Sequence, residues 1–313
     1  MRRHPCDRWL LVLLMPLVTL LISCAADHRE RSSMTLSQCI EPAHAKSPDI
    51  RRNLSDIERA GLCYRHQQVR EGRFTWSFHI LEHRQHPQGP FWILPHDNEN
   101  TAFDVGVQAV IDYGGGLLAV DSGGQRHFLG QDPNRNFSRT NAEAKRCPGQ
   151  RHPAPGYSQA VLDHYRSRRG PILALHNNLN GWTGNGGAGS ISLERESPSL
   201  RAYPGQGSGR LRDEDNLVFV AGTRPLQSDP ALKHRIKALN EAGLNVMHKQ
   251  VSQANFDCSL SDYVSQHRLG EYYNIEAEHG DRHSQQQMVE RLLAVLGIPR
   301  LSAERPSSPF LQP

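Results

Sequence analysis

The chain has 313 residues, of which 37% are hydrophobic and 22% charged, and its formal net charge at pH 7 is +4. This length is enough for one large domain with its own hydrophobic core. The basic residues form no long block and do not alternate with aromatic residues, so the sequence disfavours a nucleic-acid partner.

The first 23 residues have the pattern of a secretion signal. A short basic start precedes the apolar run WLLVLLMPLVTLLIS, which is too short for a comfortable membrane span. The run ends in LISC, which resembles a bacterial lipobox and predicts lipidation of Cys24; an ordinary cleaved signal or a short anchor helix is the alternative. Ala25 follows the cysteine, and in this the sequence resembles Gram-negative lipoproteins that are sent to the outer membrane. We therefore expect a protein that is lipid-anchored to the bacterial outer membrane and faces the periplasm.

The remaining chain divides into three predicted parts. Residues 24–50 are polar and Ser/Arg-rich, as in a tether, residues 51–298 form one domain, and residues 299–313 form a loose Pro/Ser-rich tail. Four cysteines remain in the mature chain, an even number in an oxidising compartment, and they predict two disulfides. Three pairings are possible, and the one that we predict is Cys39–Cys63 with Cys147–Cys258.

Apolar residues recur with the periods of strands and helices in turn. Every second residue from Phe74 to Ile80 is aromatic or aliphatic, which is typical of a strand with one buried face. Phe103, Val107 and Val110 instead share one face of a helix over residues 100–113. Similar patterns predict further strands at 90–94, 117–121, 171–176, 216–223, 244–251 and 272–278, and further helices at 155–169, 230–243, 259–270 and 284–297.

This alternation predicts an α/β fold, with a mostly parallel or mixed central sheet and helices on both faces. Residues 177–215 interrupt it. A segment of this length inside a compact domain is usually functional or disordered. Trp182 within it either stacks on a substrate or anchors the segment.

Polar side chains follow two of the predicted strands. The stretch FWILPHDNENTAF places His96 and Glu99 directly after one strand, and His176 closes the strand PILALH. In α/β sheets, ligands bind at the carboxyl ends of the strands. Two histidines and a glutamate are the ligand set of a catalytic zinc with a position left for water, so we predict one Zn²⁺. Asp97 could support the ligands from behind or be merely solvated, and we interpret it as a solvated residue.

Two further groups have the chemistry that such a site needs. Asn134 and Arg135, in GQDPNRNF, can hold a substrate carboxylate, although Arg135 could instead be a surface ion-pair partner. Glu276 and Glu278 lie on one face of a strand near its end. A glutamate beside an activated water is the usual general base in hydrolysis.

A second His-x-x-Glu occurs in HILEH, residues 79–83, which matches the inverted zincin pattern. That pattern binds metal from a helix. Here the alternating apolar residues place the segment on a strand, where Glu82 points away from both histidines. We interpret it as the polar edge of a hairpin, with side chains that face water.

Taken together, these segments resemble the zinc carboxypeptidase superfamily, which includes a carboxypeptidase A branch and a succinylglutamate desuccinylase/aspartoacylase branch. The resemblance covers most of residues 64–297. Residues 70–99 look like the opening hairpin, the strand after it and the His-x-x-Glu motif, and DPNRNF looks like the Asp-x-Asn-Arg-Asn-aromatic motif. LALH looks like the strand of the third ligand, and residues 259–280 look like the run that ends in the catalytic strand.

The resemblance implies a role for each matching residue. It makes Glu276 the general base, with Glu278 as the alternative. The implied zinc ligands are His96, Glu99 and His176, and the implied carboxylate-binding pair is Asn134 and Arg135.

The sequence departs from the carboxypeptidase pattern at three places. Asn98 replaces the arginine that precedes the ligand glutamate, so HDNE is closer to the HGNE form of the desuccinylase branch. The arginine that stabilises the oxyanion is not where digestive carboxypeptidases have it; Arg126 lies near the position where the desuccinylase branch carries one, and the resemblance implies this catalytic role for it. The tyrosine that the family places upstream of the base is missing, because the count leads to the region of Ala254. The likeness therefore supports the metal site better than carboxypeptidase specificity.

These inferences lead to a zinc-dependent hydrolase that cleaves an amide bond in a peptide or acyl-amino-acid substrate. A periplasmic lipoprotein meets murein stem peptides, so a murein carboxypeptidase or amidase is the first hypothesis. A deacylase of small N-acyl amino acids would use the same residues in a tight, closed pocket. A non-catalytic binding lipoprotein on the same fold is the third hypothesis.

Overall fold

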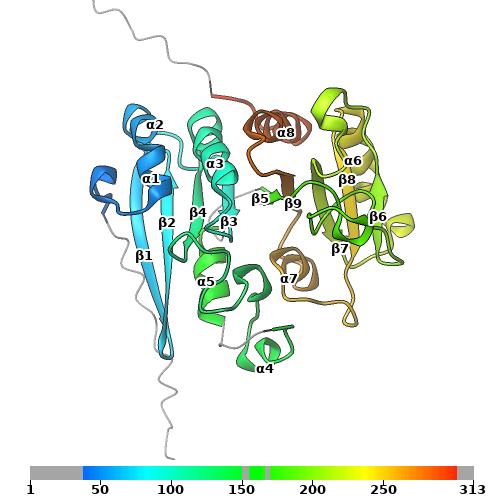
Figure 1. Ribbon diagram of the computed structural model, residues 1–313, viewed down its shortest axis with the longest axis horizontal. Helices are drawn as coiled ribbons and strands as arrows, with labels where there is room; N and C mark the ends of the chain where they lie inside the picture. The colour runs from blue at the N-terminus through cyan, green and yellow to red at the C-terminus, as the bar shows by residue number, and fades with distance from the viewer. Residues whose placement is uncertain (1–37, 150–154, 166–169, 302–313) are drawn as a thin grey trace, which may run out of the picture. The chain divides into compact units, whose positions relative to one another are not determined.

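The computed structural model describes residues 38–149, 155–165 and 170–301 (Figure 1). The predicted signal, the lipidation of Cys24 and most of the predicted tail lie outside these residues. At the end of the described chain, Arg300 and Leu301 still contact Asp112. None of the described helices combines the length and the apolar character that a membrane crossing requires.

A nine-stranded mixed sheet in the order β1-β2-β4-β3-β5-β9-β7-β8-β6 forms the centre of the domain (Figure 1). Neighbours from β4 to β9 are parallel, as are β7 and β8, whereas the other pairs are antiparallel. The strands are β1 (Cys63–Glu71), β2 (Phe74–Glu82), β3 (Phe91–Leu94), β4 (Gly116–Asp121), β5 (Ile172–Asn178), β6 (Leu200–Tyr203), β7 (Leu217–Gly222), β8 (Asn245–Gln250) and β9 (Tyr272–Glu278).

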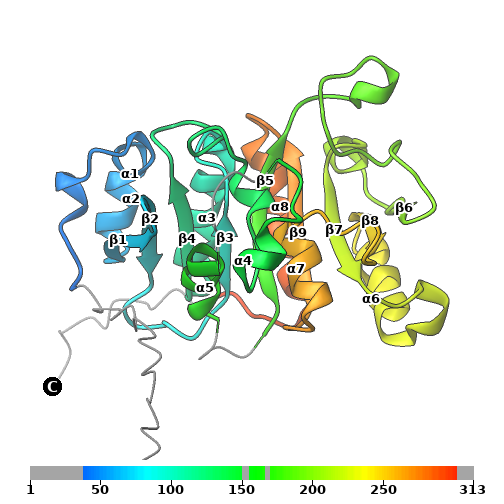
Figure 2. The same cartoon turned by 90° about the horizontal axis from the view of Figure 1, so that it is seen from below.

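Helices cover both faces of this sheet, as predicted (Figures 1 and 2). One face carries α1, α2, α3, α6 and α8, and the other carries α5 and α7. The helices are α1 (Pro48–Arg52), α2 (Leu54–Arg59), α3 (Asn100–Tyr113), α4 (Asn141–Ala144), α5 (Pro155–Asp163), α6 (Pro230–Glu241), α7 (Leu260–Gln266) and α8 (Arg282–Val295). Short 3₁₀ turns occur at Pro42–His44, Pro133–Arg135, Thr183–Asn185, Gly209–Arg212 and Leu226–Ser228.

Each face of the sheet has its own hydrophobic core. Trp92 lies in the core beneath α3, together with Phe103 and Val107, which are 2% and 1% exposed. Trp76 and Phe78 of β2 lie in the other core, beneath α5 and α7. The apolar patterns of the sequence therefore identify the buried faces of these elements correctly.

Local signals fix where several elements begin and end. The N-cap carboxylates of Asp229 and Asp281 accept hydrogen bonds from the first turns of α6 and α8. After α3 the chain turns through Gly114 and Gly115, whose φ angles are +76° and +72°. A Cβ on Gly115 would lie 1.7 Å from the carbonyl oxygen of Pro90. Glycine is therefore required for β4 to start beside β3.

Packed structure begins before residue 51, where the sequence analysis placed the start of the domain. Ile40 forms a β-bridge with Tyr64, and Ala45 and Ile50 are buried. Both predicted disulfides, Cys39–Cys63 and Cys147–Cys258, are present. The first of them ties the segment before α1 to β1.

The sequence patterns missed two strands. The strand β1 reads CYRHQQVRE, and its polar residues hide the period because only part of it is buried. The strand β6 lies within residues 177–215 and forms the edge of the sheet next to β8. In addition, β3 does not pair with β2 but lies between β4 and β5.

The HILEH segment lies on β2, as predicted for a strand. Glu82 pairs with Arg65 of β1 and not with a histidine. The interpretation that its side chains face water is wrong for His79 and His83, which are 4% and 9% exposed.

Candidate functional site

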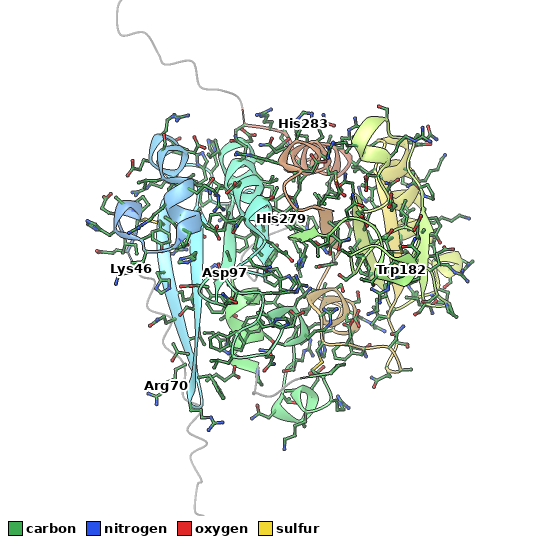
Figure 3. The ribbon with its side chains drawn as sticks, in the orientation of Figure 1. Lys46, Arg70, Asp97, Trp182, His279 and His283 are labelled. Carbon is green, nitrogen blue, oxygen red and sulfur yellow. A yellow bond between two sulfur atoms is a disulfide. The ribbon has the colours of Figure 1, made fainter. Side chains whose placement is uncertain are left out.

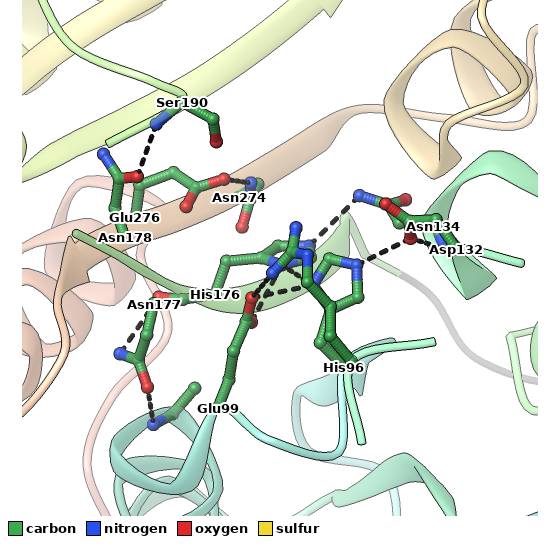
Figure 4. Close-up of polar contacts among 12 residues, drawn as sticks. His96, Glu99, Asp132, Asn134, His176, Asn177, Asn178, Ser190, Asn274 and Glu276 are labelled. Atoms are coloured by element: carbon green, nitrogen blue, oxygen red, sulfur yellow. Dashed lines mark hydrogen bonds and ion pairs between the residues drawn. The ribbon is translucent and has the colours of Figure 1, made fainter. Parts of the chain in front are cut away.

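Three elements bring the predicted metal ligands together at the carboxyl end of the parallel strands (Figure 4). His96 lies two residues after β3, and Glu99 immediately precedes α3. His176 lies on β5, which pairs with β3 in parallel. All three side chains are buried, with exposures of 3–5%.

The ligand atoms of these residues have the spacing of a metal site. His96 Nδ1 lies 2.7 Å from Glu99 Oε1 and 3.1 Å from His176 Nδ1, and His176 Nδ1 lies 3.0 Å from Glu99 Oε2. Four ligands at zinc–nitrogen bond lengths would lie about 3.3 Å apart in a tetrahedron. Two imidazole nitrogens and a carboxylate are also the donors that zinc prefers. The residues present therefore fit a zinc ion, and their role as ligands stays a prediction.

Asp132 orients the first histidine and is not among the site residues predicted from the sequence. Its Oδ1 lies 2.8 Å from His96 Nε2 (Figure 4). A proton held at Nε2 by this carboxylate leaves the lone pair of Nδ1 free for a metal, and such orienting carboxylates are common around metal-binding histidines. The signal was present in the sequence, because Asp132 begins the same DPNR stretch from which Asn134 and Arg135 were chosen.

The two carboxylates make the neighbourhood of His96 attractive to positive charge. Burial lowers the pKa of His96, but Glu99 and Asp132 outweigh this effect and raise the pKa to about 9. Burial likewise opposes ionisation of Glu99, but the two histidines hold the pKa of its carboxyl well below the usual range. Glu99 is therefore ionised and available to a cation at neutral pH.

Amide side chains fix the two ligand segments to each other. Asn177, next to His176, accepts a hydrogen bond of 2.9 Å from the backbone N–H of Ala102 at the start of α3. Gln285 of α8 donates to the carbonyl oxygen of His176 at 2.8 Å. These contacts place β5 and the start of α3 so that His176 faces Glu99, and no pattern in the sequence identified them.

Arg126, Asn134 and Arg135 all lie at this site. Arg126 Nη1 lies 2.8 Å from Glu99 Oε1, and its side chain is 40% exposed. Asn134 accepts from the N–H of Leu260 at 3.0 Å, which turns its Nδ2 toward His176 Nε2 at 3.4 Å. Arg135 donates to the carbonyl oxygen of Asn134 at 2.8 Å. The predicted roles of these three residues in binding substrate or an oxyanion stay predictions.

The two candidate bases have different surroundings. Glu276 of β9 is the register partner of His176, lines a cavity, and accepts from Asn274 Nδ2 at 2.8 Å. Burial, reinforced by the charge of Glu99, raises the pKa of its carboxyl, while His176 opposes the rise. Glu278 instead lies 3.8 Å from Arg210 and is not among the residues that line the cavity. The surroundings favour Glu276 over Glu278 as the base.

The cavity beside Glu276 has a volume of about 450 Å³. Its lining includes Asn134, which lies beside His176, together with Arg135, Lys249 and Asp257. Lys249 is balanced by Asp257 and Asp262, at 3.2 and 2.9 Å. Arg135 lies 3.7 Å from Asp257 as well, so the ion-pair role that the sequence left open for it is present, and its side chain is 39% exposed. The cavity is of the size that small-molecule sites have.

Residues 177–215 supply part of the lining of this cavity. Trp182 and Arg195 both line it, and Figure 3 shows Trp182 over the β7–β8 side of the sheet. Backbone groups of Trp182 also accept hydrogen bonds from Asn185 and Gly187, so it takes part in folding the segment as well. The segment that interrupts the sequence pattern is therefore part of the candidate site.

Asp97 has a structural role, and the interpretation of a merely solvated residue is wrong. Its Oδ2 accepts hydrogen bonds from the backbone N–H groups of Ser122 at 2.8 Å and Gly124 at 2.7 Å. The residue is labelled in Figure 3. It ties the segment between the two predicted ligands to the turn that follows β4.

Asp215 anchors the start of residues 177–215, and its ionisation makes the stability of the protein depend on pH. It is fully buried and accepts from the N–H of Gly181 and from Asn178 Nδ2. Burial raises the pKa of Asp215 to about 7; the Gly181 contact opposes the rise, and Glu214 and Asp213 add to it. The folded chain therefore binds this proton more tightly than the unfolded chain does. The stability that the proton supplies is complete below the unfolded pKa near 3.8 and is lost as the pH rises to about 7.

Asp215→Asn should remove this pH dependence, because asparagine imitates the protonated acid. Relative to the wild type, its free energy of unfolding should rise by on the order of 2 kcal/mol between pH 5 and pH 8. Urea unfolding at several pH values measures the difference. A difference between the two proteins that stays constant with pH would contradict the assignment.

The sequence matches no known family profile and no curated protein. Among solved structures, the chain is similar to a candidate metallopeptidase from Shewanella amazonensis, at 16% identity and a TM-score of 0.44, over 80% of this chain and 94% of that one. It is also similar to an aspartoacylase family protein from Mesorhizobium loti, at 14% identity and a TM-score of 0.42, over 77% and 69% of the two chains. For a metallo-carboxypeptidase from Burkholderia cenocepacia these values are 13%, 0.39, 79% and 67%. Likenesses this weak assign neither a family nor an activity to the chain, so any functional conclusion depends on the geometry of the site.

Proposed function

We propose that this protein is a zinc-dependent hydrolase that cleaves an amide bond. The observation that carries the proposal is the convergence of His96, Glu99 and His176 beside a carboxylate, Glu276, that lines an adjoining cavity. The ligand atoms lie within 4.8 Å of one another although they come from three elements. Such an arrangement buries charge at a cost, and a bound cation would offset that cost.

The residues of the chain divide the work of hydrolysis between them. A bound zinc ion would act as a Lewis acid that polarises the scissile carbonyl and lowers the pKa of a water molecule. Glu276 accepts the proton from the attacking water and passes it to the leaving amine, a role that its raised pKa suits. Arg135 and Asn134 hold a substrate carboxylate, and Arg126 stabilises negative charge on the carbonyl oxygen.

Murein stem peptides are the substrate class that we propose first. The lipobox-like start of the sequence supports an anchored periplasmic protein, and stem peptides are anionic chains with unusual amide bonds. The cations Arg135 and Arg195 in the cavity suit such a substrate. The proposed protein is then a lipid-anchored carboxypeptidase or amidase of the outer membrane.

A deacylase of small N-acyl amino acids is the second candidate. The size of the cavity favours it, because a volume of about 450 Å³ suits a single amino acid with its acyl group. Both candidates use the same residues, so they differ only in the substrates that are turned over.

Purified, zinc-loaded protein should be incubated in parallel with muropeptides and with a panel of N-acyl amino acids, and the products analysed by mass spectrometry. We expect release of an amino acid or peptide from muropeptides, abolished by a chelator and by Glu276→Gln. Turnover of acyl amino acids alone would establish the second candidate. No turnover of either class, in protein that holds zinc, would leave only a binding protein.

A further inference from the structure

A second group of potential ligands lies on the sheet outside the site described above. His66 of β1 and His79 of β2 are register partners, and Asp121 ends β4, the next strand across (Figure 1). On β4, Ala119 is the partner of His79, so Asp121 lies two residues further along on the same face. Three neighbouring strands thus present two imidazoles and a carboxylate to one point.

The distances within this group suit ligands of one metal ion, although His66 and Asp121 are also within hydrogen-bond distance of each other. Asp121 Oδ2 lies 3.2 Å from His66 Nε2 and 3.5 Å from His79 Nε2. The first is at the long end of hydrogen-bond lengths, and the second is beyond them. Both are close to the separation of about 3.3 Å expected between two ligands of a tetrahedral zinc ion. The three ligand atoms all lie within 4.8 Å of one another.

His79 supplies an independent observation. Its side chain is 5% exposed, and its Nε2 is buried with no hydrogen-bond partner. An unpaired buried polar atom costs free energy, and a native structure normally avoids it. The other ring nitrogen, Nδ1, lies 2.9 Å from the hydroxyl of Tyr64, which is itself buried. The ring is therefore held by Nδ1 with its free nitrogen aimed at Asp121, as metal-binding histidines are held by a neighbour.

We propose that His66, His79 and Asp121 form a second metal site that binds a divalent transition ion, zinc in the first place. Two imidazoles exclude a preference for calcium or magnesium, which take oxygen ligands. His66 and Asp121 are 32% and 30% exposed, so an ion can enter from solvent and water can complete its coordination. The site is independent of His96, Glu99 and His176 and does not rest on the proposed hydrolase.

Metal counting tests this proposal. Protein equilibrated against buffered free zinc should hold two zinc ions per chain, as measured by elemental mass spectrometry. His66→Ala and Asp121→Asn should each hold one, His176→Ala should also hold one, and His66→Ala combined with His176→Ala should hold none. Tyr64→Phe should weaken the second ion by about 10–100-fold in a zinc titration, as loss of an orienting contact does. His44→Ala, which removes an exposed histidine, should still hold two.

Because His66 is partly exposed, its replacement should not unfold the protein. Circular dichroism checks that the variant is folded. The proposal would be overturned if both His66→Ala and Asp121→Asn still held two zinc ions per chain. It would also be overturned if the wild type held a single ion and only His176→Ala lost it. A wild type with one ion that is lost in His66→Ala but kept in His176→Ala would support the second site and refute the metal centre of the proposed hydrolase.

Discussion

Replacing Glu276 with glutamine should lower kcat for amide hydrolysis by about 10²–10⁴-fold, the usual contribution of a general base. Glutamine has the same shape and can still accept the hydrogen bond from Asn274, but it cannot take a proton from water. Zinc content at the first site and the thermal midpoint should stay close to those of the wild type. Steady-state kinetics on whichever substrate is turned over, together with metal analysis of the same preparation, measures both effects.

Glu278→Gln is the matched control, because this carboxylate lies two residues away on the same strand. It should leave kcat near the wild-type value, since its nearest charged partners are Arg210 and acidic neighbours, and it does not line the cavity. If Glu278→Gln abolished turnover and Glu276→Gln did not, the assignment of the base would be reversed. Equal, small effects of both would remove the general-base role from this strand.

Loss of the first metal ion is the second large expected effect. His176→Ala should weaken zinc binding at this site by more than about 100-fold, which exceeds the 10–100-fold typical of an orienting residue. Asp132→Asn should fall in that smaller range, because asparagine can still accept from His96 Nε2 but loses the charge that holds the ring. Competition with a chromophoric chelator measures both affinities, and turnover should fall in the same order.

His279→Ala serves as the control for histidine removal near the site. His279 follows β9, is exposed, and contacts the site only through its backbone N–H, which donates to the carbonyl of Asn178 (Figure 3). Its replacement should change neither zinc binding nor turnover. Two results would contradict the proposed coordination. One is an unchanged zinc affinity in His176→Ala, and the other is a zinc affinity that is lower in Asp132→Asn than in His176→Ala.

Several features of the molecule could be read from residue patterns because they depend on local chemistry. The alternation from Phe74 to Ile80 predicts a strand because side chains of a strand point to opposite faces in turn. His96 and His176 could be placed in one site because the carboxyl ends of parallel strands meet at one edge. The even count of cysteines predicted two disulfides, whereas the pairing was a choice among three possibilities that no local pattern fixed and that the structure confirms.

Other features could not be read in this way because they depend on which segments become neighbours. Asp132 is one of many aspartates in the sequence, and only the folded chain places it 2.8 Å from His96. HILEH lies on a strand, so its own motif cannot bind a metal. Pairing with β1 and β4 is what brings His79 next to His66 and Asp121, and strand pairing is set by long-range packing.

The sequence by itself determined the identity of the predicted ligands, most of the helices and strands, and the buried faces of β2 and α3, because these follow from side-chain chemistry and short-range periodicity. The tertiary structure alone decided the order of the strands, the orienting contact of Asp132 and the grouping of His66, His79 and Asp121. Each of these requires residues distant in the chain to meet, and the free energy that selects such meetings comes from burial of whole faces, which no local pattern contains.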